Sequence, residues 1–490
     1  MLSVNTTQAA PKRLGAISVL AWSGLESGCR QILSLLFFFA TVRFITPADL
    51  GIFALGVALN GIVAIVIDEP IGEALVQQHT ATITDWDTGY SLNIALAVLC
   101  LCVAVLGSQV LAGLLNEPSL RFVVPALALS SVVGAVGNIH KAYLSRSLRF
   151  RAIAQTALAG QLFGGAISLG LAASGFGYWA LVANVMAAAM ATSIVYRIIT
   201  PWRPSLRIDP GFIRARGSYI GYSMAIRTLY LVRDQSLFVV AGSVGSLATV
   251  GYLSLAMRVA RALGQFFEEI TSRPLISLIS RHQNDLSHFR AVLVKILHLV
   301  GLLAFPCFVG LAGLGTPLIA TLIGPHWAPA GHFLPWICAG TGGWLLLHII
   351  AASLRARGLG REALCLTAPI IIIDTAIFAS ASLVGLDWAL IAWTARAALS
   401  LPVLTYAMSS RLGVSGRVLL QVWAAPALAS MVMLLGLHWL PGSQTLTGGG
   451  GAQSLAACIV AAAALYAIAW LVLSAGSLRG KSLLKPAGDE

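Results

Sequence analysis

The sequence predicts an all-α polytopic membrane protein, and three observations support this fold class. Charged residues make up only 10% of the 490 residues, whereas they make up about 25% of an ordinary soluble domain. Hydrophobic residues make up 58%. They are gathered into runs of about 20, the length that spans a bilayer as a helix. This composition excludes a soluble enzyme and a disordered chain.

Fourteen apolar runs are long enough to be transmembrane helices, and Pro, Gly and charged clusters such as Thr46-Pro47-Ala48-Asp49 separate them. The periodicity and the breakers predict helices near 15–41, 50–68, 89–115, 122–140, 153–174, 177–196, 217–241, 248–272, 291–313, 333–353, 363–384, 388–409, 418–440 and 453–475.

The positive charges test this map. If the N-terminus is cytoplasmic and the spans alternate in direction, 22 of the 31 Lys and Arg fall in cytoplasmic segments. Only Arg43 and Arg121 fall in segments on the opposite side, as the positive-inside rule expects. The segment between the second and third spans differs, because it has no Lys or Arg and carries acids. We therefore expect both termini in the cytoplasm. The net charge of +13 then reflects topology, and no nucleic-acid partner is expected.

A weak internal repeat appears when the chain is offset by 200 residues, which aligns Gly51 with Gly251 and Asp68-Glu69 with Glu268-Glu269. Repeats of this kind are typical of secondary transporters, whose binding site lies between the repeats. We expect two pseudo-symmetric six-helix lobes followed by two more helices. The expected divisions are an N-terminal tail 1–14, lobes 15–200 and 217–410, a cytoplasmic inter-lobe loop 201–216, two helices in 411–475 and a C-terminal tail 476–490.

Charged residues occur inside the predicted spans, and most of them follow helical spacing. Each charge at the bilayer centre costs about 2.5–3.5 kcal/mol on insertion scales, so these side chains are expected to face protein, water or one another. In four predicted helices the polar and charged residues lie along one face of the helix. The four sets are Ser23, Glu26, Arg30 and Ser34; Ser223, Arg227, Tyr230 and Asp234; Arg258, Arg261, Gln265 and Glu268; and Trp393, Arg396 and Ser400.

Arginine outnumbers acid among the deep charges, which predicts a cationic site. The deep set comprises Arg30, Arg227, Arg233, Arg258, Arg261 and Arg396 against Glu26, Asp234 and Asp374. Guanidinium groups bind phosphate through paired hydrogen bonds, so the expected substrate is an anion that carries phosphate. A structural role stays open, because Glu26 and Arg30 can neutralise each other and Arg396 can clamp Asp374 across two helices.

The residues of the predicted site fall into two groups with different expected roles. Substrate binding is expected from Arg30, Arg227, Arg258, Arg261 and Arg396, and coupling or gating from Glu26, Asp234, Asp374, Asp68 and Glu268. No cofactor, metal site or catalytic residue is expected. The seven Cys lie in apolar runs without metal-ligand spacing, and the chain has no GxxxxGK[ST], HExxH or GxSxG motif. Transport is therefore expected to draw on a proton or Na⁺ gradient.

The stretch from Val42 to Leu55 resembles the bacterial polysaccharide repeat-unit flippases of the Wzx type in the MOP superfamily, in their colanic-acid-exporter-like branch. Further similar segments are Ile67 to Gln78, Gly177 to Val182, Pro306 to Gly313 and Gly324 to Trp327. The chain departs from the family at Asp68-Glu69-Pro70, where relatives often have a single Asp in a Gly-rich turn.

The resemblance implies a flippase that moves polyprenyl-diphosphate-linked oligosaccharide across the bacterial inner membrane for exopolysaccharide, capsule or O-antigen (lipopolysaccharide) synthesis. It implies alternating access from the cytoplasmic to the periplasmic leaflet. Membrane lipid, polysaccharide polymerase and assembly proteins are the implied partners. Tyr230 and Trp393 would then serve as aromatic platforms for the glycan. Two alternatives stay open, a small-molecule or drug antiporter of the same superfamily and a membrane polysaccharide polymerase or ligase.

Overall fold

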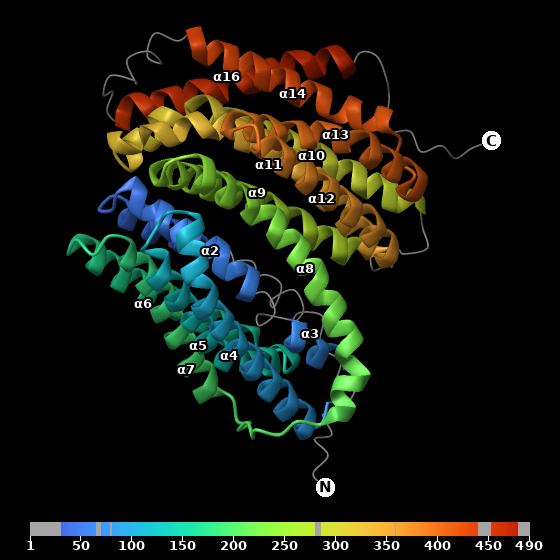
Figure 1. Cartoon of the computed structure of the whole chain (residues 1–490). Coiled ribbons are helices and arrows are strands. Elements are labelled where there is room, and N and C mark those ends of the chain that lie inside the picture. Colours follow the sequence, from blue (N-terminus) through green and yellow to red (C-terminus); the bar gives the residue numbers. More distant parts are fainter. Residues whose placement is uncertain are drawn as a thin grey trace. The chain divides into compact units, whose positions relative to one another are not determined.

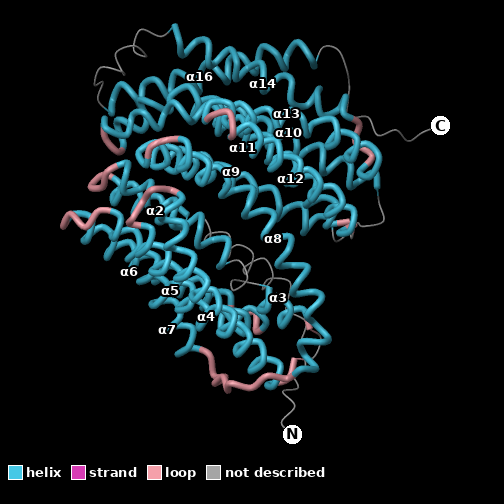
Figure 2. The backbone as a smooth tube through the Cα atoms, viewed as in Figure 1, coloured by secondary structure: helices cyan, strands magenta, loops and turns pink. Residues whose placement is uncertain are grey.

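The computed structural model describes residues 31–64, 70–78, 81–279, 286–357, 359–439 and 452–478. Within these ranges the chain is helical and contains no strand, and short turns and loops join the helices (Figures 1 and 2). The chain divides into two compact units, Met1–Gln235 and Ser236–Glu490. The all-α fold class is therefore confirmed.

The first unit begins with a described helix over Gln31–Val42. It continues through α2 (Pro47–Ala64), α3 (Pro70–Gln77), α4 (Ile83–Leu114), α5 (Leu120–Arg146), α6 (Phe150–Ala173) and α7 (Tyr178–Ile199). The boundary between the units falls inside a single helix, α8 (Pro210–Val244), after Gln235.

The second unit contains the end of α8 and the rest of the described chain. Its elements are α9 (Leu247–Ile279), α10 (Leu286–Leu322), the 3₁₀ helix η1 (Pro325–Phe333), α11 (Leu334–Ala356), α12 (Gly360–Ser382), α13 (Leu386–Leu412), α14 (Gly416–Trp439) and α16 (Ala452–Leu478). Within this unit α10 packs against α14, α11 against α9 and α13, and α14 against α16.

Every predicted span from 50–68 onward overlaps a helix. Of the first predicted span, 15–41, only the part from residue 31 lies in the described chain. Ten of the described helical segments are long and apolar enough to cross a membrane, so the chain is a multi-pass membrane protein. Helices α8 and α9 are not among the ten, and both carry several charged residues. The number fourteen stays a prediction.

Helix starts differ from the predicted boundaries where polar residues begin a helix early. Helix α4 starts at Ile83 because Thr82 and Asp85 form a capping box, in which each side chain accepts the other's backbone N–H. Helix α8 starts at Pro210, and the Asp209 carboxylate accepts the N–H of Gly211. Residues 210–216 of the predicted inter-lobe loop therefore form the first two turns of α8.

Close helix contacts depend on glycine at particular positions. In the first unit α5 packs against α4 and α7, and a Cβ at Gly137 would lie 2.9 Å from the Cα of Ser193. In the second unit a Cβ at Gly343 would lie 3.1 Å from the Cα of Ala397, where α11 meets α13. Small residues let helix backbones approach and are common where membrane helices pack.

The segment between α7 and α8 is fixed to the start of α4. Buried Asp87 accepts hydrogen bonds from Trp202 Nε1 and from the Ser205 backbone N–H, both at 3.1 Å, and from the Ser205 hydroxyl. The Asp209 backbone N–H donates to Thr88 Oγ1 at 3.0 Å. This segment is therefore held by buried polar contacts.

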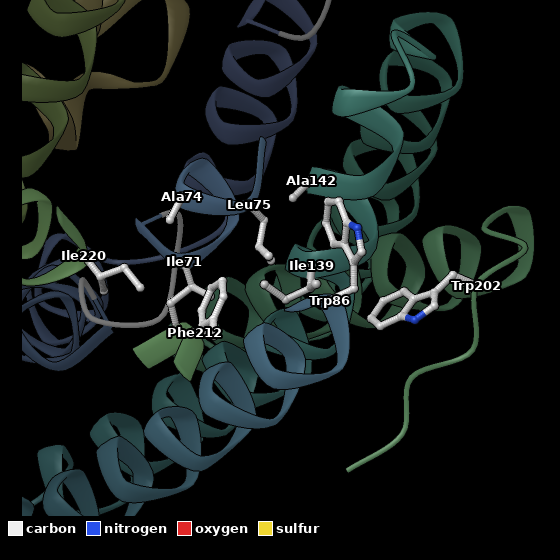
Figure 3. Packing of buried hydrophobic residues seen from close by; sticks show 9 residues of the cluster. All are labelled: Ile71, Ala74, Leu75, Trp86, Ile139, Ala142, Trp202, Phe212 and Ile220. Carbon is white, nitrogen blue, oxygen red and sulfur yellow. The ribbon is translucent and has the colours of Figure 1, made fainter. Parts of the chain in front are cut away.

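Trp202 of this attachment also belongs to an apolar cluster (Figure 3). The ring centroids of Trp202 and Trp86 lie 6.2 Å apart. The cluster brings together α3, α4, α5, the 200–209 segment and α8, through Ile71, Ala74, Leu75, Trp86, Ile139, Ala142, Trp202, Phe212 and Ile220. The first unit therefore has a packed core at the end where α4 and α8 begin.

We expect Asp87→Ala to lower the free energy of unfolding by about 1–3 kcal/mol, because the indole N–H of Trp202 would lose its acceptor in a buried place. Thermal unfolding of the purified protein measures this change. Asp387→Ala is the control, because Asp387 is exposed at the start of α13. Equal shifts for the two variants would contradict the role of Asp87.

Candidate functional site

The predicted site residues are distributed over both units, and some lie outside the described residues. Glu26, Arg30 and Asp68 are in that second group. Tyr230 lies in α8, but its side chain is not described. Arg227 and Asp234 belong to the first unit. The second unit carries Arg258, Arg261, Glu268, Asp374, Trp393 and Arg396.

Arg227 of α8 forms an ion pair with Glu73 of α3. Its Nη2 lies 2.6 Å from Glu73 Oε1, and Ser223 Oγ, one turn earlier on α8, donates to Glu73 Oε2 at 3.4 Å. The two charged side chains keep 33% and 38% of their area exposed. The pair is thus accessible to a ligand, and it connects α8 with α3.

Glu73 is held in place by the attachment of α3 to its neighbours. Arg146 of α5 donates to the carbonyl oxygens of Leu75 at 2.7 Å and Gln78 at 2.6 Å. A cation at the C-terminal end of a helix is favourable, because the last carbonyl groups lack helical partners. Gln78 also donates to Asp85 of α4 at 3.1 Å.

Glu73 is not among the site residues that the helical spacing predicts. The signal that pointed toward it was the acidic segment between the second and third predicted spans, which lacks Lys and Arg. That segment contains the whole of α3, which is too short to span a bilayer and has no place among the predicted helices.

Asp234 pairs with its sequence neighbour. Asp234 Oδ1 lies 2.9 Å from Arg233 Nη2, and the Arg233 side chain is only 5% exposed, against 36% for Asp234. The two arginines of this part of α8 therefore differ. Arg233 is buried beside Asp234, whereas Arg227 reaches a carboxylate on another helix and stays accessible.

The charges of α9 lie on one accessible face of the helix. Arg258 is exposed, and Arg261 and Glu268 are partly exposed. The opposite face is buried, as shown by Ala256, Ala260 and Phe267. The predicted charged face is thus the open side of α9 and presents two guanidinium groups one turn apart.

Arg396 and Trp393 lie in the core of the second unit. Arg396 Cζ lies 3.4 Å from the Trp393 ring centroid, and its Nε donates to the Trp393 carbonyl at 3.0 Å. Phe378 of α12 meets the same indole edge to face, with ring centroids 6.1 Å apart. A Cβ at Gly340 of α11 would lie 2.4 Å from Trp393 Nε1.

Asp374 is also buried. It lies one turn before Phe378, and α12 and α13 are joined by only three residues, so the helices run in opposite directions. Asp374 therefore lies near the level of Arg396. This arrangement favours the structural role that the sequence left open for these two residues. Because Trp393 is covered on several sides, an aromatic platform for a glycan is not supported there.

A comparison with known protein families assigns the chain. Residues 41–331 match the model of a family described as polysaccharide biosynthesis protein. The chain belongs to this polysaccharide biosynthesis protein family. The match covers the helices of the first unit from α2 onward and continues to η1 in the second. The resemblance seen in the sequence is confirmed at the level of this family.

Curated relatives of this family member are similar over part of their length. The teichuronic acid biosynthesis protein TuaB of Bacillus subtilis is 22% identical over 63% of this chain and 64% of its own. The lipopolysaccharide biosynthesis protein WzxC of Escherichia coli is 24% identical over 66% of each chain. The succinoglycan biosynthesis transport protein ExoT of Rhizobium meliloti is 22% identical over 61% of each chain. The chain thus spans somewhat less than two thirds of these relatives.

Solved structures share the fold over most of the chain. The lipid II flippase MurJ, in an inward closed conformation, has a TM-score of 0.73 at 12% identity and covers 93% of this chain and 98% of its own. An inward-facing multidrug resistance transporter of the MATE family in the MOP superfamily has a TM-score of 0.52 at 15% identity, over 78% and 96%. This polysaccharide biosynthesis protein therefore shares its fold with MurJ and, over a smaller part of the chain, with this MATE transporter.

We expect Trp393→Ala to lower the free energy of unfolding by about 3–5 kcal/mol, because it leaves a cavity beside Phe378 and removes the ring that Arg396 covers. Trp388→Ala is a matched control in the same helix, because Trp388 is 57% exposed and Trp393 is 2% exposed. Chemical unfolding monitored by circular dichroism measures both. Similar losses would contradict the burial of Trp393 as the cause.

Proposed function

We propose that this protein is a flippase for polyprenyl-diphosphate-linked oligosaccharide repeat units. It moves them from the cytoplasmic to the periplasmic leaflet of the bacterial inner membrane for the synthesis of exopolysaccharide, capsule or O-antigen. Membership of the polysaccharide biosynthesis protein family supports this proposal. The names of WzxC and ExoT and the fold shared with the lipid II flippase MurJ support it further.

The observation that carries the proposal is the set of accessible guanidinium groups on helices of both units. Arg227 is one-third exposed on α8, and Arg258 and Arg261 line the open face of α9. A diphosphate matches such groups, because each guanidinium donates two parallel hydrogen bonds to phosphate oxygens. We propose that each of these three arginines, and Arg30, can bind a phosphate group of the substrate.

We propose that transport proceeds by alternating access without a chemical reaction on the substrate. The protein first takes up the lipid-linked headgroup from the cytoplasmic side and then exposes it to the periplasm. A proton or Na⁺ gradient drives the cycle through partly exposed acids such as Asp234 and Glu268. Both termini lie in the cytoplasm, as the distribution of Lys and Arg supports. Polysaccharide polymerase and assembly proteins act next on the flipped unit.

We expect Arg227→Ala and Arg258→Ala each to lower transport about ten-fold or more, because a hydrogen bond to a charged group contributes about 1.5–3 kcal/mol. Surface polysaccharide output in cells with matched protein levels measures the loss. Arg121→Ala is the control, because Arg121 is an exposed arginine at the start of α5. If both site variants keep full output, the cationic site is wrong.

Reconstitution tests the function directly. Liposomes that contain the purified protein and a labelled lipid-linked oligosaccharide should move the label to the opposite leaflet. The rate should rise when a pH or Na⁺ gradient is imposed, because the proposed acids bind the coupling ion. Rates that ignore both gradients would contradict acid-mediated coupling, and a static label would contradict the flippase itself.

A further inference from the structure

The ion pair between Glu73 and Arg227 joins two elements of the first unit that are held independently. Glu73 lies on α3, whose other face is buried through Ile71, Ala74 and Leu75. Arg146 holds the C-terminal end of α3. The position of the carboxylate is thus set by α3 and its neighbours rather than by Arg227.

The ion pair between Glu73 and Arg227 is also partly exposed to solvent. About a third of each side chain is exposed, so an anion can reach the guanidinium without unpacking the helices. The pair on the same helix between Arg233 and Asp234 is different, because Arg233 is almost completely buried. Of these two ion pairs, the one at Arg227 is therefore the one that a ligand can exchange.

We propose that Glu73 is an intramolecular counter-ion of Arg227. The substrate diphosphate displaces Glu73 from Arg227 on binding, and Glu73 displaces the diphosphate on release. This inference rests on the proposed function and adds a residue to its site. In the unloaded protein the Glu73 carboxylate is paired with the Arg227 guanidinium, as in the structure. A diphosphate carries more negative charge than a carboxylate and takes over the hydrogen bonds of Arg227.

The return of Arg227 to Glu73 then favours release. A site of arginines alone would hold a diphosphate tightly, and a slow release would limit turnover. A carboxylate within 2.6 Å of the same guanidinium weakens binding and shortens the bound state. Glu73 is thus a positioning residue that acts through Arg227.

The exchange predicts that Glu73→Gln binds the diphosphate more tightly and transports it more slowly. The full chain in phosphatidylcholine nanodiscs, which present no anionic lipid headgroup, is titrated with a short-chain polyprenyl diphosphate. Affinity should rise about two- to five-fold, the range that a partly exposed ion pair allows. Turnover in liposomes at saturating substrate should fall, whereas Arg227→Ala should weaken binding and lower turnover together.

A matched control is available in the second unit. Glu362 pairs with Arg411 at 3.6 Å, and both side chains are partly exposed. Glu362→Gln removes an ion pair of the same kind far along the chain and should leave the affinity unchanged. Inorganic pyrophosphate is titrated in parallel, and a gain in its affinity for Glu73→Gln supports an exchange with the diphosphate group itself.

The outcomes separate this inference from the proposed function. If Arg227→Ala weakens binding but Glu73→Gln binds like the unaltered protein, the exchange is wrong and the cationic site stands. If the unaltered protein neither binds nor flips the lipid diphosphate, the proposed function is wrong and the exchange with it. Thermal unfolding checks that each variant is folded. If Glu73→Gln does not fold, Glu73→Asp takes its place. It keeps the carboxylate but moves it away from Arg227 by one methylene, so the affinity for the diphosphate should rise by less.

Discussion

The structure depends on one constraint, which is that a charge on a membrane helix needs a partner where water is scarce. Along α8 and α13 the chain meets this need in three ways. Arg233 uses the next residue, Asp234. Arg396 uses the face of Trp393. Arg227 uses Glu73 on a separate helix. Only the last solution leaves the guanidinium within reach of a ligand, and this difference separates a binding residue from a structural one.

Much of the fold could be predicted from the sequence, because apolar runs of bilayer length leave few alternatives. The predicted spans overlap the described helices, and the errors lie at starts such as Ile83 and Pro210, where capping groups extend a helix beyond its apolar run. The short helix α3 was missed because eight residues produce no span-length signal. Hydropathy thus locates the middle of a membrane helix better than its ends.

The candidate site was less predictable, because spacing defines the face of a helix but not the element it meets. The pattern placed Ser223 and Arg227 on one face of α8, and both reach the same carboxylate. No pattern in the sequence indicates that this carboxylate belongs to Glu73, which lies 154 residues away. Likewise, spacing cannot distinguish a covered tryptophan such as Trp393 from an exposed one such as Trp388.

The attachment of residues 200–209 to α4 has a consequence for the length of the connection between α7 and α8. Connections between helices usually tolerate insertions and deletions because their backbones face water. Here Trp202, Ser205 and Asp209 must each reach a fixed partner at Asp87 or Thr88. Adding or removing one residue between Trp202 and Asp209 would change the spacing between at least two of these three contacts. The length of this connection is therefore set by the positions of its hydrogen-bond partners on α4.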